Sequence, residues 1–124
     1  MKLASLRNDS RDGQLLVVNN AVSRAVSATD IAPTLQAAMD DWLAVEPALS
    51  DRYRKLNLGQ LADEFNFEPK DCASPLPRAF QFLDGSVYLS HMEKARQARG
   101  AAMPNNYTTE PLMYQGLSDS FLGP

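Results

Sequence analysis

Several features that mark common protein classes are scarce in this 124-residue sequence. It contains one cysteine, Cys72, so neither an intrachain disulfide nor a multi-cysteine metal site can form, and such sparse use is typical of a reducing compartment. The first residues turn polar without the apolar core of a signal peptide, and no apolar run approaches the roughly 18 residues of a membrane span. We therefore expect a soluble, cytoplasmic protein that does not bind membranes.

Positive charge is also in short supply. The formal net charge is −3, from 12 Lys and Arg residues against 15 Asp and Glu residues. Binding to the phosphates of nucleic acids requires a clustered basic excess, so a nucleic-acid partner is not expected. Lys94, Arg96 and Arg99 form a local basic group beside Glu93, and we interpret it as the solvated face of a helix.

The apolar pattern of the first 26 residues predicts β-structure. Two short apolar runs, at 2–7 and 14–19, flank a cluster of turn-forming residues in which Gly13 can adopt positive φ. These runs predict a β-hairpin. A third strand is predicted over 21–26, where Val22 and Val26 would share one face.

Two short helices are predicted next. Pro33 suits a first helical position, Pro47 is expected to restart the chain as a second helix, and Gly59 is a natural end for that helix. One apolar stripe at helical spacing consists of Leu35, Met39, Trp42 and Leu43. We interpret this stripe as core packing rather than as the lining of a ligand pocket.

The helical periodicity of the apolar residues ends near residue 60. Phe65 and Phe67 are expected to anchor an extended segment on the core, and the proline-rich remainder up to residue 77 predicts a linker. Beyond the linker we predict a strand over 78–83, a turn at Asp84-Gly85, a helix from about Ser86 and a final short strand over 111–115.

His91 is the only histidine of the chain and lies on the predicted helix. Helical spacing places it on a semi-apolar face with Tyr88 and Met92. Two interpretations remain open: a packed, hydrogen-bonded histidine, or a general base that exchanges protons near neutral pH. The chain has no nucleophile elbow, phosphate-binding loop, dinucleotide-binding glycine pattern or H-E-x-x-H motif, and we predict no metal ligands in it.

The segments GSVYLSHMEKARQARG (85–100) and EPLMYQGLSDSFLGP (110–124) resemble the opening of the catalytic domain in the fumarylacetoacetate hydrolase family. Tyr88-Leu89-Ser90-His91 fits the Tyr-x-x-His motif of that family, and Glu110-Pro111-Leu112-Met113-Tyr114 fits the strand that follows the motif. Residues 1–18 and 31–42 look like the small N-terminal domain that many bacterial members carry.

The resemblance implies an α+β fold in two parts. Residues 1–72 would form the N-terminal domain, with a β-hairpin, a further strand and two helices. Residues 73–124 would form the first strand, helix and strand of a mixed-β catalytic domain that is truncated in this chain.

The resemblance also implies an activity. Family members cleave carbon–carbon bonds in β-dicarbonyl acids such as fumarylacetoacetate and acylpyruvates, with Mg²⁺ or Ca²⁺ holding the oxygens of the substrate. By carry-over, His91 would be the acid/base residue with Glu93 as its catalytic partner. Tyr88, Tyr114 and Gln115 would contribute to the pocket for the small dicarbonyl acid, and a homodimer is expected.

Three departures from the family pattern limit this expectation. Lys94 occupies the position where many members have a glutamate, Gln115 follows Tyr114 where many have a lysine, and Glu110 and Asp119 lack the Glu-x-Glu spacing of the cation-binding acids. We therefore expect the N-terminal portion of a hydrolase, inactive by itself. One alternative is a non-catalytic dimerising or partner-binding module, in which a partner would cover the apolar segment at 110–115. The other is a small complete enzyme that uses His91 and Glu93 without metal.

Overall fold

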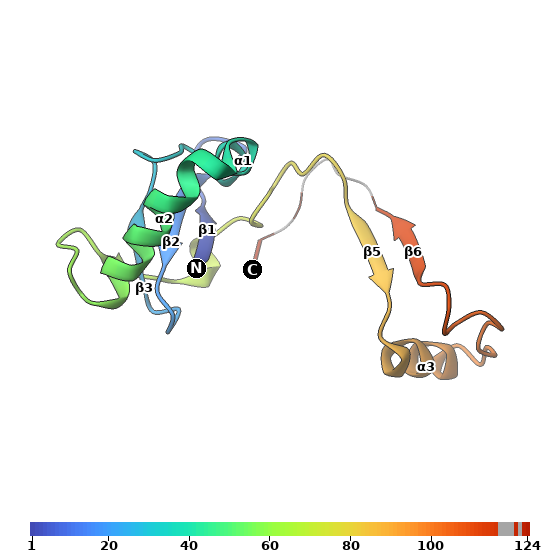
Figure 1. Ribbon diagram of the computed structural model, residues 1–124. Coiled ribbons are helices and arrows are strands. Elements are labelled where there is room, and N and C mark those ends of the chain that lie inside the picture. The colour runs from blue at the N-terminus through green and yellow to red at the C-terminus, as the bar shows by residue number, and fades with distance from the viewer. Residues whose placement is uncertain (117–120, 122) are drawn as a thin grey trace. The chain divides into compact units, whose positions relative to one another are not determined.

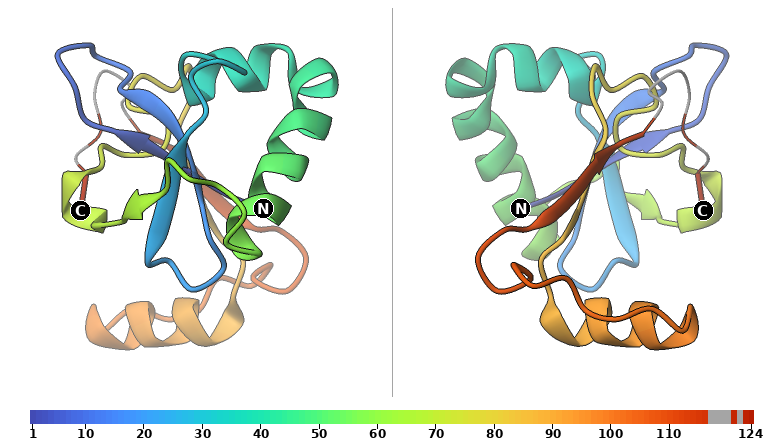
Figure 2. Two further views of the ribbon diagram at one scale, coloured as in Figure 1. Left: turned by 90° about the vertical axis from the view of Figure 1, so that its left-hand side faces the viewer. Right: turned by 90° about the vertical axis from the view of Figure 1, so that its right-hand side faces the viewer.

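The computed structural model describes residues 1–116, 121, 123 and 124, which fall into two compact units (Figures 1 and 2). Unit 1 comprises Met1–Ala79 and Asp119–Pro124, and unit 2 comprises Phe80–Ser118. Asp119 and the other residues of the C-terminal motif at 117–120 and 122 lie outside the described residues.

Unit 1 is built on an antiparallel sheet with the strand order β1-β2-β3-β4. Its strands are β1 (Lys2–Leu6), β2 (Gln14–Val18), β3 (Arg24–Ser27) and the two-residue β4 (Phe65–Asn66). The predicted β1–β2 hairpin is confirmed, with Lys2 opposite Val18 and Leu6 opposite Gln14. The third strand begins later than predicted, because the Asn19 side chain accepts hydrogen bonds from the backbone N–H groups of Ser23 (2.9 Å) and Arg24 (3.1 Å) and so holds a turn there.

Two helices of unit 1, α1 (Leu35–Asp40) and α2 (Trp42–Asn57), follow the third strand. Thr34 caps α1 by accepting a hydrogen bond from Ala37 N (3.1 Å), so the predicted start at Pro33 is wrong. The predicted restart at Pro47 is also wrong, since Pro47 lies inside α2 and the chain breaks instead at Asp41, at φ −130° and ψ 43°. None of the helices in the described part of the chain is long and apolar enough to cross a membrane.

The core of unit 1 follows from the alternation of side chains along β2. Leu15 and Val17 point to the face that α1 and α2 cover, where they pack with Leu49 of α2 (Figure 1). Leu16 and Val18 point to the opposite face and pack with Ala25, and the partly buried Phe67 closes that cluster. Both faces of the central strand are therefore buried, as its continuous apolar run indicates.

The segment predicted as a linker is packed along β1. After a 3-10 turn (Pro69–Asp71), Cys72 forms an isolated bridge with Leu6, and Ala73 N donates to Ser5 O (2.9 Å). The buried Ser5 hydroxyl donates to the carbonyl of Pro75 (2.6 Å). This segment thus covers the outer edge of the sheet, where β1 would otherwise expose unpaired backbone N–H and C=O groups.

Unit 2 contains a strand, a helix and a strand, in the predicted order. β5 (Leu83–Ser86) pairs antiparallel with β6 (Leu112–Gln115), and α3 (Leu89–Ala98) lies between them in sequence. The strand predicted over 78–83 is wrong in position. The turn predicted at Asp84-Gly85 is also wrong, because both residues are paired within β5, opposite Tyr114 and Met113. Pairing with a strand nearly thirty residues away overrides the local turn preference of the Asp-Gly pair.

Candidate functional site

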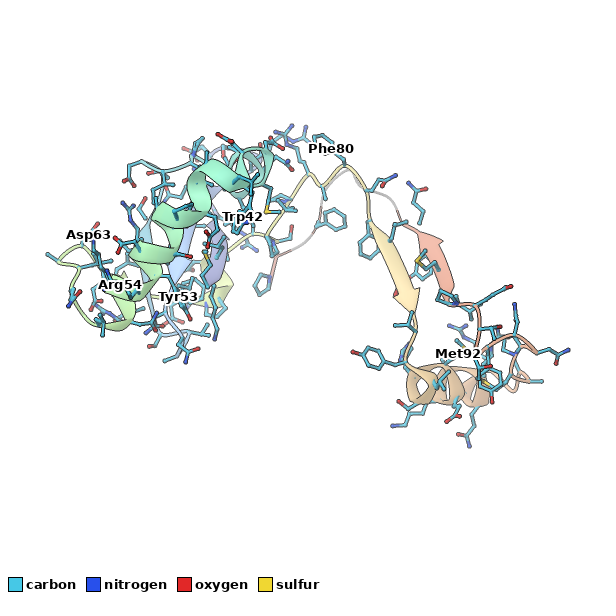
Figure 3. The ribbon with its side chains drawn as sticks, in the orientation of Figure 1. Trp42, Tyr53, Arg54, Asp63, Phe80 and Met92 are labelled. Atoms are coloured by element: carbon cyan, nitrogen blue, oxygen red, sulfur yellow. The ribbon has the colours of Figure 1, made fainter. Side chains whose placement is uncertain are left out.

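A pocket of about 350 Å³ lies in unit 2 and takes side chains from β5, α3 and β6. Its polar lining consists of Asp84, His91, Arg96, Arg99 and Tyr114. The remaining lining is apolar and includes Met92, which is labelled on α3 in Figure 3. An apolar pocket with a few converging polar groups is a common form of small-molecule site.

The orientation of α3 brings three of these groups to the pocket. Met92 is the only side chain of α3 that is buried, with 3% of its surface exposed. Arg96 and Arg99 follow Met92 at spacings of four and seven residues, so they lie on the same side of the helix. His91 is adjacent to Met92, and its backbone N–H closes the first helical turn on the carbonyl of Tyr88 (3.0 Å).

Asp84 and Tyr114 form a cross-strand pair. They are direct partners in the β5–β6 register, where side chains on one face lie close together. The hydrogen bond to the Asp84 carboxylate, together with its negative charge, raises the pKa of Tyr114 above its ordinary value. The phenol is the donor of this hydrogen bond and the Asp84 carboxylate is the acceptor, and both side chains line the pocket.

The structure brings together two of the five residues predicted for the site. His91 and Tyr114 both line the pocket. His91 is exposed, so the interpretation of this residue as a histidine packed in a core is wrong, while its role as a general base stays a prediction. Glu93 is exposed and does not line the pocket, as expected for a residue two positions from His91 on a regular helix.

The two other predicted substrate-binding residues also lie outside the pocket lining. Tyr88 precedes α3 as its N-cap residue and has 78% of its surface exposed. Gln115 ends β6, opposite Leu83, and is exposed. Neither of them contributes to the pocket around His91.

Sequence reasoning missed three polar residues of the pocket. The basic group interpreted as a solvated face includes Arg96 and Arg99, yet both line the pocket, because they follow Met92 by four and seven residues and share its side of α3. The Asp-Gly pair predicts a turn at Asp84. Only the pairing of β5 with β6 places its carboxylate opposite Tyr114, and no local pattern signals that pairing.

The divalent cation that the resemblance implies does not fit the described residues. Among the described residues, Asp84 is the only carboxylate in the lining of the pocket. Across the part of the chain that the structure describes, no three His, Cys, Asp or Glu side chains gather closely enough to hold a metal ion. Mg²⁺ and Ca²⁺ prefer several oxygen ligands, and one carboxylate is too few for a site made by protein groups.

A comparison with protein families matches the first part of the chain. Residues 1–78 match the family described as "Fumarylacetoacetase N-terminal domain 2". No curated protein matches the chain. The matched region covers more than half of the 124 residues and ends one residue before the first segment of unit 1 does, at Ala79. The chain therefore belongs to the fumarylacetoacetase N-terminal domain 2 family.

Proposed function

We propose that this chain serves the hydrolysis of a carbon–carbon bond in a β-dicarbonyl acid such as an acylpyruvate, and that unit 2 contributes acid/base and carboxylate-binding groups. The observation that carries the proposal is the pocket in which the only histidine of the chain, two arginines and a tyrosine converge. Family membership of residues 1–78 supports the reaction class.

The charges of the pocket suit an acidic substrate. Arg96 and Arg99 present guanidinium groups, which bind carboxylates through paired hydrogen bonds. Asp84 would repel a carboxylate, but the Tyr114 hydroxyl donates a hydrogen bond to it, so the arginine side of the pocket is the favoured place for the acid group of the substrate. The β-dicarbonyl portion would then lie toward His91.

His91 has the chemistry that the reaction requires. In the proposed step the imidazole takes a proton from water as the water oxygen bonds to the substrate carbonyl carbon. The carbon–carbon bond then breaks, its electron pair remains on the released enolate carbon, and the imidazolium returns the proton to that carbon. The products are a carboxylic acid and a methyl ketone acid, so atoms and electrons balance.

We further propose that the 124-residue chain does not turn over the substrate by itself. The described residues offer no carboxylate cluster to hold the cation that the resemblance implies, so these ligands would come from other polypeptide. The chain, on this proposal, works as one part of a hydrolase in the cytoplasm, as a homodimer.

The imidazole signals of His91 provide a test, because a chain with one histidine gives one set of such signals. Titration with a millimolar acylpyruvate should shift them in an NMR spectrum. The double variant Arg96→Gln/Arg99→Gln should reduce the affinity about tenfold or more, since hydrogen bonds to charged groups contribute about 1.5–3 kcal/mol each.

Lys94→Gln is the matched control. Lys94 lies on the same helix and carries the same charge, but it is exposed and outside the pocket lining, so the control should bind as the unchanged chain does. Unshifted His91 signals, or equal binding by the double variant, would refute the proposed site. Turnover by the purified chain that His91→Ala abolishes would refute the claim that the chain is inactive alone.

A partner-binding or dimerising module is the second candidate. Its support is the exposure of large apolar side chains on the β5–β6 pair, where Leu83, Met113 and Tyr114 expose 54%, 63% and 59% of their surfaces. Such a surface commonly marks an interaction site. Light scattering should then report a dimer that the Met113→Ser variant dissociates, and acylpyruvate should leave the His91 signals unshifted. A monomer would exclude this candidate and also the homodimer of the first proposal.

A further inference from the structure

Unit 1 carries a second hollow, at the corner between α1 and α2, which is independent of the proposed hydrolase site. We call it the corner groove; it has a volume of about 690 Å³. Its lining residues are Met1, Leu3, Leu35, Met39, Trp42, Leu43 and Glu46. Trp42, the only tryptophan of the chain, is labelled at this corner in Figure 3.

The corner groove exposes apolar side chains that the sequence pattern assigns to the core. Leu43 exposes 91% of its surface and Met39 exposes 50%. The chain breaks at Asp41, so the two halves of the predicted stripe do not continue one helix, and only Leu35 becomes buried. The core interpretation of Met39 and Leu43 is therefore wrong. Methionine and leucine at the mouth of a groove form an adaptable apolar surface that can bind an amphipathic helix.

Three acidic residues belong to the segment that forms this apolar surface. Asp40 and Asp41 are exposed and lie in sequence between the groove residues Met39 and Trp42, while Glu46 lines the groove itself. In the described part of the chain no Lys or Arg forms an ion pair with these three acids. Lys2, the nearest basic residue in sequence to Met1, directs its ammonium group to the carbonyl of Asn20 (2.6 Å).

We propose that the corner groove is a docking site for an amphipathic helix of a partner protein that carries basic residues beside its apolar face. Apolar anchors of the helix would fill the space between Met39, Trp42 and Leu43. Its Lys or Arg side chains would meet Asp40, Asp41 and Glu46, which supplies the complementary charge that steers association.

The acidic rim disfavours the other occupants of such a groove. A second copy that used the same face would place these acids against themselves, because a two-fold interface brings identical patches together. An anionic membrane surface would repel the rim as well. A basic helix is the occupant that gains from both the apolar floor and the rim.

Trp42 makes a direct test practicable, since the fluorescence of the chain reports on one indole. The probe is a synthetic amphipathic peptide of about 16 residues, roughly 24 Å long as a helix, with leucines on one face and lysines beside them. Its partner probe has glutamates in place of the lysines. We expect the lysine peptide to shift the emission of Trp42, the glutamate peptide to leave it unchanged, and added salt to weaken the first effect.

Two variants of the full chain locate the binding. Leu43→Ser and the double variant Asp40→Lys/Asp41→Lys should each weaken the lysine peptide about tenfold, since removal of a central anchor commonly costs more than 1 kcal/mol. All three positions are exposed, so the fold should tolerate the changes. Leu58→Ser is the matched control, because Leu58 is also an exposed leucine of unit 1 (59%) but lies outside the corner groove.

Four outcomes would overturn the proposal: no response of Trp42 to the lysine peptide, equal binding of both peptides, unchanged binding by Leu43→Ser, or an equal loss in Leu58→Ser. Self-association of the unchanged chain that Leu43→Ser abolishes would also overturn it, because a second copy would then occupy the groove. A failure of the acylpyruvate experiment does not affect this result, since that experiment concerns unit 2.

Discussion

Unit 1 and unit 2 use the same kinds of element but bury very different amounts of apolar surface. Unit 1 packs nine buried residues between its sheet and helices and three more on the opposite face of the sheet. In the described part of unit 2, Met92 is the only buried apolar side chain, and every residue of β6 is exposed. Unit 1 is thus a fold with its own core, whereas unit 2 presents its side chains outward.

This difference separates the forces that hold the two units. Burial of apolar surface is the dominant favourable term in folding, and unit 1 has enough of it to stabilise a domain. The β5–β6 pair depends on strand pairing and on contacts around Met92, and an isolated two-stranded sheet is marginal in water. The groups proposed for chemistry lie in unit 2, so the site and the main source of stability belong to different parts of the chain.

The strongest test of this comparison is a truncation in each core. Leu49→Ala removes a side chain of α2 that is fully buried in unit 1, and it should lower the free energy of unfolding by about 2–5 kcal/mol. Met92→Ala in unit 2 should leave the main urea unfolding transition unchanged and alter only the NMR signals of α3, β5 and β6. Equal losses for the two variants would show that the two units share one cooperative core.

A pair of glycine substitutions within unit 1 should give the next largest effect. Gly13 has φ +67°, and an added Cβ would lie 2.6 Å from the carbonyl oxygen of Leu6. Gly59 has φ +63° with no atom within 4 Å of that position. Gly59→Ala should therefore cost about 1–2 kcal/mol from backbone strain alone, whereas Gly13→Ala adds a steric clash of about 1–3 kcal/mol.

The corresponding glycine substitution in unit 2, Gly100→Ala, tests whether the two units are stabilised separately. Gly100 also has φ +63° and open space around it. Gly100→Ala should reduce amide-exchange protection at the end of α3 without moving the thermal midpoint of unit 1. A drop in that midpoint equal to the drop in Gly59→Ala would contradict the separation of the units.

A smaller effect, of opposite sign, is expected at the β2–β3 turn. Val22 is the only non-glycine residue with positive φ (57°) among the described residues, and a β-branched side chain is unfavourable there. Val22→Asn should raise the stability of unit 1 by about 0.5–1 kcal/mol, because asparagine tolerates this conformation. Ala21→Asn, at an exposed neighbour without positive φ, is the control and should be neutral in chemical denaturation.

The two units should also respond to opposite ends of the pH scale. In unit 1, the hydrogen bond from Arg52 lowers the pKa of Asp30. The stability that this pair contributes is present above the unfolded pKa of about 3.9 and is lost as the pH falls through the lower folded value. Asp30→Asn should flatten this part of the acid unfolding profile, and an unchanged profile would exclude the pair as a contributor.

In unit 2 the sign is reversed. The pKa of Tyr114 is raised by its hydrogen bond to Asp84, so the contribution is present below the unfolded pKa of about 10 and is lost as the pH rises through the folded value. Tyr114→Phe should remove the alkaline change in the NMR signals of β5 and β6. Asp30→Asn, in the other unit, should leave that change as it is.

Local patterns predicted the parts of the fold that depend on neighbours in sequence. The β1–β2 hairpin follows from two apolar runs around a turn, and the end of α2 follows from Gly59. Patterns failed where distant residues decide, as at Asp84, which pairs with Tyr114, and at Pro47, which α2 accommodates. Local propensity is a weak preference of less than a few kcal/mol, so tertiary packing can override it.

By itself, the sequence determined the α+β class and the family of residues 1–78, and it singled out His91 as a residue to examine. Tertiary structure decided that Asp84, Arg96 and Arg99 join His91 at one pocket while Glu93 lies outside it. It also decided that Met39 and Leu43 form an open groove instead of a core. The physical reason is that residue types and their spacing determine which face of a helix or strand is apolar and which is polar. The pairing of strands and the break between helices determine which other residues each face contacts.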